Sequence, residues 1–173
     1  MTIPSDITDS HLSKTALAHD QASLLIVELS AALHTYGVAA HDLEESMTET
    51  AAALGLTANF FATPTSIFVS FGRFPNQHTT LLRVRPGDVN LEKLEELYEL
   101  NRNILSDAIS AAEGLQRVRT ILSKPTRYGA GMTLAAFALA TSTASIFFGG
   151  GWEELMASLV IGTMIGLLAW LTS

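Results

Sequence analysis

The chain has 173 residues, enough for one domain with an appendage, and a net charge of −7. It contains no cysteine, which excludes disulfide bonds and thiol chemistry. Acidic residues outnumber Lys and Arg by 17 to 10, so we expect no nucleic-acid partner, because nucleic-acid binding needs clustered basic residues.

Charge is distributed unevenly along the chain. Every Lys and Arg lies at or before Arg127, and the 46 residues after it carry only Glu153 and Glu154 as charged groups. The first part therefore has the composition of a water-soluble domain and the second that of a lipid-soluble segment. We expect three regions: a disordered tail over 1–18, a cytoplasmic α+β domain over 19–124 and a transmembrane helical hairpin over 125–173.

The N-terminal residues 1–18 are polar and lack the basic start and apolar run of a signal peptide. Two amphipathic helices are predicted next, over 19–36 and 40–54. Each carries apolar residues about every four positions and is followed by a helix-ending glycine, Gly37 or Gly55.

Three strand-like segments follow, rich in aromatic and β-branched residues. They are "NFFAT" (59–63), "SIFVSF" (66–71) and "HTTLLRVR" (78–85). Pro64 lies between the first two, where it fits a bend because it cannot donate to a ladder. The pattern predicts a small sheet of about three strands.

Two further helices are predicted over 91–108 and 110–123. Asn90 is a suitable N-cap for the first, and Ser110 with Glu113 has the spacing of a capping box for the second. The expected fold class is an α-helical membrane protein with an N-terminal α+β domain of two helices, a small sheet and two helices, followed by two transmembrane helices.

The apolar end predicts two membrane spans. Residues 128–148 are uncharged over 21 positions, which as a helix is about 31 Å, the thickness of a bilayer core. Residues 155–171 are uncharged over 17 positions. The intervening "GGGWEE" suits the tip of a hairpin, since glycines allow a sharp turn and Trp prefers the interface. Glu153 and Glu154 either stabilise the start of the second helix or handle substrate or protons.

The basic residues predict the orientation of the hairpin. Arg117, Arg119, Lys124 and Arg127 precede the first span and the tip has no base, so the N-terminal domain is expected in the cytoplasm. The localisation expected is the cell (inner) membrane of a bacterium, with a multi-pass topology.

Both spans carry small residues at a spacing that allows close helix packing. These are Ala136, Ala140 and Ala144 on the first span and Ser158, Gly162 and Gly166 on the second. The hydroxyls of the first span either bond their own helix backbone or face a polar path. Because two helices form no pathway, we expect membrane lipid and further transmembrane helices as partners, from missing sequence, a partner subunit or self-association.

Candidate catalytic chemistry is sparse. His34, His41 and His78 with Glu44 and Glu45 lack the spacing of a known metal motif, so we expect no metal and no cofactor. A hydrolase triad from Ser66 or Ser70, His78 and Asp42 lacks the GxSxG sequence that usually presents the nucleophile.

Four stretches, in order, carry a resemblance that covers about residues 20–173. They are "GVAAHDLEESM", with Gly37, Glu44 and Met47; "ATPTSIFVS", with Thr63, Pro64 and Thr65; "RPGDVNLEKLEELYELNR"; and "FFGGGWEELMASLVIG". Together they resemble the N-terminal half of the threonine/serine exporter (ThrE-type) family, which includes the YjjP-type subunit of a dicarboxylate exporter. The chain departs from the family pattern at Asp42 and Leu43, where the family often has Arg before the glutamate. Family members carry about five spans in this half, so the chain is expected to be a fragment or a short member.

The resemblance implies a secondary transporter, not an enzyme, that exports small polar metabolites such as threonine, serine or a dicarboxylate. The hydroxyls of Thr141, Ser145 and Thr163 are the candidates for the membrane path. Glu44, Thr63 and Thr65 are candidates for gating or regulation in the cytoplasmic domain, where packing or turn roles are the alternative. The other functional hypotheses are a membrane-anchored regulatory or interaction domain without transport, and the membrane-tethered hydrolase.

Overall fold

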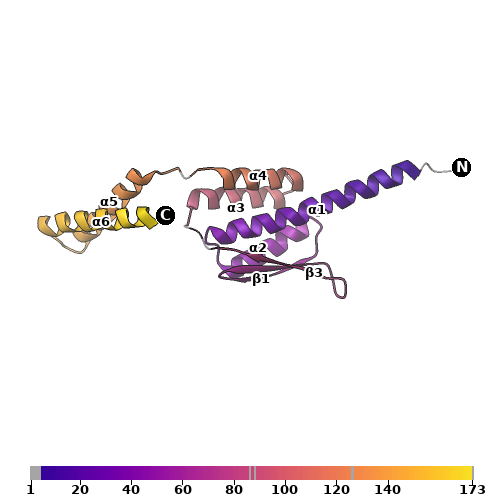
Figure 1. Cartoon of the computed structure of the whole chain (residues 1–173), viewed down its shortest axis with the longest axis horizontal. Coiled ribbons are helices and arrows are strands. Elements are labelled where there is room, and N and C mark those ends of the chain that lie inside the picture. The colour runs from indigo at the N-terminus through magenta and orange to yellow at the C-terminus, as the bar shows by residue number, and fades with distance from the viewer. Residues whose placement is uncertain (1–4, 86, 88, 126, 173) are drawn as a thin grey trace. The chain divides into compact units, whose positions relative to one another are not determined.

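The computed structural model describes residues 5–85, 87, 89–125 and 127–172, with side chains described for all of these except 5–16, 130 and 172. The chain forms two compact units, residues 1–124 and 125–173. The described residues form six helices and one three-stranded antiparallel sheet, so the protein is mostly helical (Figure 1).

The first helix is longer than predicted. Helix α1 spans Ser5–Thr35 and projects beyond the other elements of its unit at its N-terminal end (Figure 1). The expected disordered tail over 1–18 is therefore wrong from Ser5 onward, and residues 1–4 lie outside the described residues. The helix start predicted at residue 19 relied on apolar periodicity. That periodicity ends where the helix leaves the core, as the 58% exposure of Leu17 shows. No Gly or Pro between Ser5 and Thr35 interrupts the helix.

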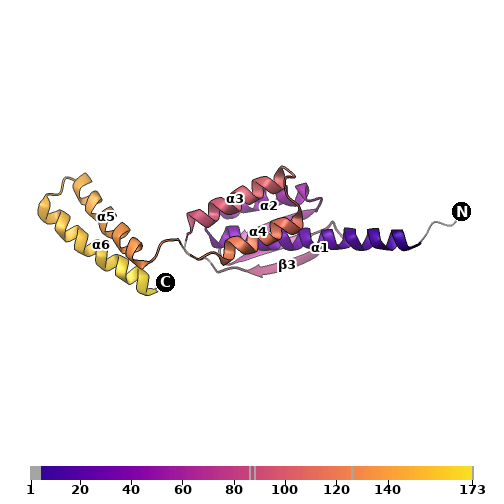
Figure 2. The same ribbon diagram turned by 90° about the horizontal axis from the view of Figure 1, so that it is seen from above.

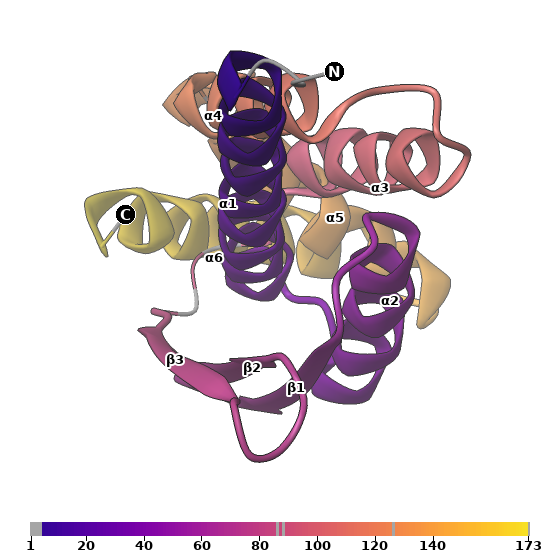
Figure 3. The ribbon, with the colours of Figure 1, turned by 90° about the vertical axis from the view of Figure 1, so that its right-hand side faces the viewer.

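The predicted sheet is confirmed. Strands β1 (Ala58–Thr63), β2 (Ser66–Phe71) and β3 (His78–Arg83) pair as an antiparallel meander in the order β1-β2-β3. Helix α2 (Ala40–Ala53) packs against β1, and all the helices of this unit lie on one side of the sheet (Figure 3). Successive side chains alternate between the faces of a strand, so Ile67 and Val69 are buried under the helices while Phe68 is exposed.

Both predicted helix caps are present. The Asn90 side chain accepts from the Lys93 N–H at the start of α3 (Leu91–Leu105), and the Ser110 hydroxyl accepts from the Glu113 N–H at the start of α4 (Ala111–Ser123). Helix α3 ends three residues earlier than predicted, because the chain turns through Asp107 in a left-handed conformation.

The core of the first unit lies between α1, α2, α3, α4 and the sheet. Leu25, Leu29, Leu33, Leu43, Met47 and Leu97 are among its fully buried side chains. A small polar cluster lies in this core between α2 and α3: the buried Thr50 hydroxyl lies 2.7 Å from Asn101 Oδ1, and Asn101 Nδ2 donates to Ser46 Oγ at 3.0 Å. Polar groups buried between α2 and α3 are therefore hydrogen-bonded, as burial requires.

The second unit is a pair of helices, α5 (Ala130–Phe147) and α6 (Trp152–Thr172), which lie side by side (Figure 2). Within the described residues, α6 alone is long and apolar enough to cross a membrane, over Trp152–Leu171. The apolar part of α5, Gly131–Phe147, is shorter. The structure thus gives one clear span where the sequence predicted two.

Candidate functional site

The contact between α5 and α6 depends on two glycines of α6. Gly162 and Gly166 are buried, and a side chain added at Gly162 would overlap the Thr141 hydroxyl and lie 2.7 Å from the Phe137 carbonyl oxygen. Ser158, one turn earlier, is half-buried on the same side. The stripe Ser158, Gly162 and Gly166 therefore faces α5, which lets the two backbones approach closely.

The alanine stripe predicted for the first span does not lie in this contact. Ala136, Ala140 and Ala144 are all exposed, and α6 packs instead on the face that carries Ala138, Thr141, Ser142 and Ser145. Spacing by four identifies a stripe but not the face that a neighbouring helix covers. Positions 138, 141, 142 and 145 have the spacing i, i+3, i+4 and i+7, a pattern that places residues on one helix face and that the prediction did not use.

The hydroxyls proposed for a membrane path do not gather in one place. Thr141 lies in the helix contact, where its hydroxyl is 2.9 Å from the Ser158 carbonyl and also within reach of the Phe137 and Ala138 carbonyls. Thr163 is exposed on α6 and donates to the Leu159 carbonyl of its own helix at 2.8 Å. Ser145 is half-buried next to the hairpin turn, where its carbonyl accepts from the Gly150 N–H.

The turn between α5 and α6 shows what the carboxylate of Glu154, one of the two acids, contacts. Gly149 takes a left-handed conformation with a φ of 83°, which favours glycine. Glu154 Oε2 accepts from the Gly151 N–H at 2.9 Å, in the first turn of α6. This is the capping interaction, one of the two alternatives raised for these carboxylates, and it satisfies an N–H that the helix itself leaves free.

In the first unit, Glu44, Thr63 and Thr65 lie around the first strand pair. Glu44 is half-buried on α2 and its Oε1 accepts from the Ala62 N–H of β1 at 2.7 Å. The Thr63 hydroxyl lies 2.7 Å from Ser66 Oγ across the tight turn, and the Thr65 carbonyl accepts from the Val84 N–H. Glu44 therefore ties α2 to the outer edge of the sheet, Thr63 holds the turn that connects β1 to β2, and the Thr65 backbone joins that turn to the residue after β3.

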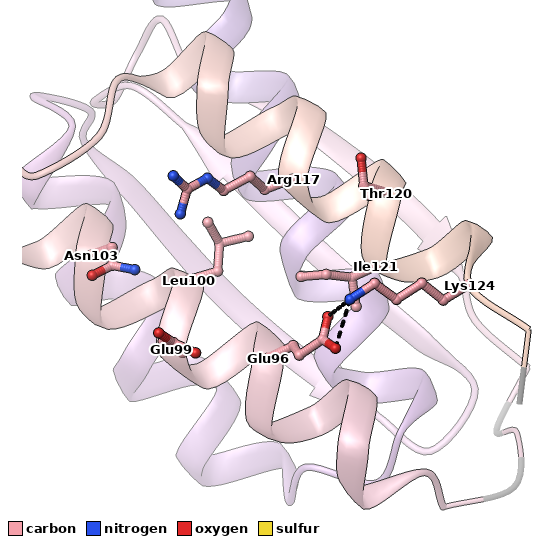
Figure 4. A pocket seen from close by; sticks show the side chains of 8 residues that line it. All are labelled: Glu96, Glu99, Leu100, Asn103, Arg117, Thr120, Ile121 and Lys124. Atoms are coloured by element: carbon pink, nitrogen blue, oxygen red, sulfur yellow. Dashed lines mark hydrogen bonds and ion pairs between the residues drawn. The ribbon is translucent and has the colours of Figure 1, made fainter. Parts of the chain in front are cut away.

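A groove of about 410 Å³ lies between α3 and α4 (Figure 4). Leu100 and Ile121 contribute apolar surface to it, and Lys124 Nζ forms an ion pair with the Glu96 carboxylate at 2.6 Å. Arg117 also lines the groove and pairs with Glu113 at 2.7 Å. Because both cations already have acidic partners, the groove has no uncompensated positive charge to offer an anionic ligand. The groove was not predicted, since Glu96 and Lys124 are 28 residues apart and no local pattern links them.

Two alternative chemistries find no assembled site in the part of the chain that the structure describes. No three His, Asp or Glu side chains there gather into a metal site, and His41 pairs with Asp42 at 3.2 Å. Ser70 Oγ bonds to the Thr79 hydroxyl at 2.9 Å and Ser66 Oγ to the Thr63 hydroxyl at 2.7 Å, so both serines proposed as the nucleophile have other partners.

Residues 24–173 match the family model described as "Putative threonine/serine exporter". The chain belongs to this family. The resemblance inferred from the four sequence stretches is thereby confirmed, and with it the assignment to a family of membrane proteins.

Relatives of this exporter-family chain are found in fungi. It is 30% identical over 155 residues to pheromone-regulated membrane protein 10 of Eremothecium gossypii, which covers 88% of this chain and 21% of that protein. It is 31% identical over 150 residues to the protein of the same name from Yarrowia lipolytica, covering 84% of this chain and 12% of the relative. The chain thus spans about a fifth or less of the length of these relatives. No solved structure matches it.

Proposed function

We propose that this chain is part of a secondary transporter that exports small polar metabolites, such as threonine, serine or a dicarboxylate, across the cell membrane. The family match over 24–173 carries this proposal. In it, α5 and α6 form a transmembrane hairpin and the first unit lies in the cytoplasm. Further transmembrane helices come from additional sequence, a partner subunit or a second copy.

The close packing of α5 on α6 supports a path that lies outside the hairpin, between it and other helices. The two helices approach at Gly162 and Gly166, so there is no room for a metabolite between them. Residues on the remaining surfaces are then the ones that meet other helices and line a path. Thr163 is exposed on α6, and its hydroxyl can bind a polar substrate without disturbing the contact with α5.

Efflux of labelled threonine, serine and succinate from liposomes that contain the purified full-length protein, with any subunit that co-purifies with it, tests the function. We expect efflux of at least one compound above that of protein-free liposomes. Thr163→Val is expected to lower it. Thr143→Val is the matched control for loss of an exposed hydroxyl that bonds only its own helix, at the Leu139 carbonyl, and an equal loss of efflux with both variants would show that the effect is not specific to Thr163. Equal efflux with Thr163→Val removes this residue from the path, and no efflux of any compound contradicts transport by this chain.

A membrane-anchored domain without transport is the second candidate. One observation favours it: within the described residues, a single helix meets the length and apolarity of a membrane span. The same liposome assay separates the two functions, because an anchor leaves efflux at the protein-free level.

A further inference from the structure

The outer face of the sheet carries an apolar cluster that none of the described residues of its unit covers. Phe61 on β1, Phe68 on β2 and Leu81 on β3 are direct cross-strand neighbours, and the Phe61 and Phe68 rings lie 6.0 Å apart. Phe61 is 61% exposed and Leu81 is 60% exposed. Phe74, in the loop between β2 and β3, is 90% exposed. The helices pack on the opposite face of the sheet (Figure 3).

Charge is segregated between the sheet and the helices. Residues 50–87, which contain all three strands, include Arg73, Arg83 and Arg85 and no Asp or Glu. The remaining residues of 1–124 hold 15 Asp and Glu against six Lys and Arg. The sheet is therefore a positive region within a strongly acidic unit.

The three sheet arginines also differ from those of the helices in their contacts. Arg102, Arg117 and Arg119 each form an ion pair with a glutamate. Arg73, Arg83 and Arg85 are exposed and have no acidic partner among the described side chains. Arg83 shares the outward side of β3 with Leu81, and Arg85 joins Arg83 in lining a surface pocket beside Thr65. Their charge is thus available to an external anionic partner.

The chain length between the two units limits where that partner can be. Helix α4 ends at Ser123 and α5 begins at Ala130, and the residues between them extend to at most about 25 Å. If α5 and α6 insert as proposed, the sheet belongs to a unit that is held close to the membrane. The cytoplasmic leaflet is negatively charged and attracts basic segments within a Debye length.

We propose that the outer face of the sheet docks on the anionic surface of the membrane that holds the hairpin. Phe61, Phe68 and Leu81 contact the interface, and the arginines of residues 50–87 bind lipid phosphates. The inference rests on the transmembrane hairpin of the proposed function. An acidic protein surface has the same charge but no comparable tether in this chain, so the membrane is the partner that the observations favour.

A single fluorophore on the sheet face tests the docking. The chain has no cysteine, so Thr79→Cys introduces one labelling site on the exposed side of β3, and Gln116→Cys introduces a matched site on the exposed side of α4. The full chain is placed in phosphatidylcholine nanodiscs with or without phosphatidylglycerol, and doxyl-labelled lipid is the quencher. We expect quenching at position 79 in the anionic discs only, its loss at high salt, and little quenching at position 116.

Neutralising arginines distinguishes a specific face from general charge. Arg73→Gln, Arg83→Gln and Arg85→Gln together are expected to lower the ratio of docked to free sheet by about a hundredfold, since each contributes about fivefold. The same change at Arg102, Arg117 and Arg119 alters net charge equally and is expected to leave position 79 quenched.

Failure of this inference is distinguishable from failure of the hairpin. Trp152 and Trp170 both lie in α6 and are the only tryptophans, so their quenching by the same lipid reports insertion. If they are not quenched, both proposals are overturned. If they are quenched and the label at 79 is not, the membrane docking alone is overturned. The docking alone is also overturned if the label at 79 is shielded from solvent as strongly in detergent as in nanodiscs, because protein and not lipid then covers the sheet.

Discussion

Adding one methyl group at Gly162 tests how closely α5 and α6 pack. The new Cβ would overlap the Thr141 hydroxyl and lie 2.7 Å from the Phe137 carbonyl oxygen and 3.0 Å from Ala138 Cα. Two of these three atoms belong to the α5 backbone, so relief requires the helices to separate. Overpacking of this kind costs about 1–3 kcal/mol, and alanine recovers only about 0.5–1 kcal/mol by its better helix propensity.

Two other glycines make the test specific. At Gly166 the nearest atoms are Leu134 Cδ2 and Phe137 Cβ, both at 3.2 Å, and Leu134 Cα at 3.3 Å, so the contacts are tight but do not overlap as they do at Gly162. Gly166→Ala is therefore expected to cost less than about 1 kcal/mol. Gly131 has no atom within 4 Å of its added Cβ, so Gly131→Ala is expected to be neutral or slightly stabilising.

Titration with sodium dodecyl sulfate in a mild detergent, followed by tryptophan fluorescence, measures these differences. Both tryptophans lie in α6, so the signal reports the hairpin and not the first unit. The expected order of destabilisation is Gly162→Ala, then Gly166→Ala, then Gly131→Ala. A Gly162→Ala midpoint equal to that of Gly131→Ala would show that the helices do not meet at this position.

Three changes in the first unit follow from its contacts, and chemical denaturation of the full chain, followed by circular dichroism, measures each. Met47→Ala removes a fully buried side chain and is expected to cost about 2–5 kcal/mol; a loss below 1 kcal/mol would contradict its place in the core. Asn101→Ala removes the hydrogen bonds that its amide makes with the buried Thr50 hydroxyl and with Ser46 and is expected to cost about 1–3 kcal/mol, whereas a neutral result would mean that water replaces the amide. Glu44→Ala removes the carboxylate bonded to the Ala62 N–H and is expected to cost about 1.5–3 kcal/mol; the exposed Glu45→Ala is the control, and equal effects would refute the link.

Local signals predicted most of the first unit. Asn90 and Ser110 fix helix starts through bonds to residues three positions later, and such bonds depend only on nearby sequence. The strands followed from their composition and from Pro64, which sits in the turn between β1 and β2. The early end of α3 was not predicted, because Asp tolerates the left-handed conformation of Asp107 but also occurs within helices, so the residue type alone does not end a helix.

Contacts between distant elements were beyond the sequence. Glu28 on α1 and Arg119 on α4 are 91 residues apart, yet they form a bidentate pair in which the hydrogen bond and then the charge of Glu28 raise the pKa of the arginine. The same limit applies to the hairpin. The stripe of Ala136, Ala140 and Ala144 is real in the sequence, but which side of α5 meets α6 depends on the neighbour and not on the stripe.

The Thr141 hydroxyl has one proton and three carbonyls within 3.0 Å, two on its own helix and that of Ser158 on the next. When the bond to Ser158 breaks, the proton rotates to an acceptor in α5 and no donor is left stranded in an apolar setting. Separating the two helices at this point therefore loses van der Waals packing but almost no hydrogen-bond energy. A helix contact of this kind can open and close repeatedly, whereas an ion pair at the same position would resist opening.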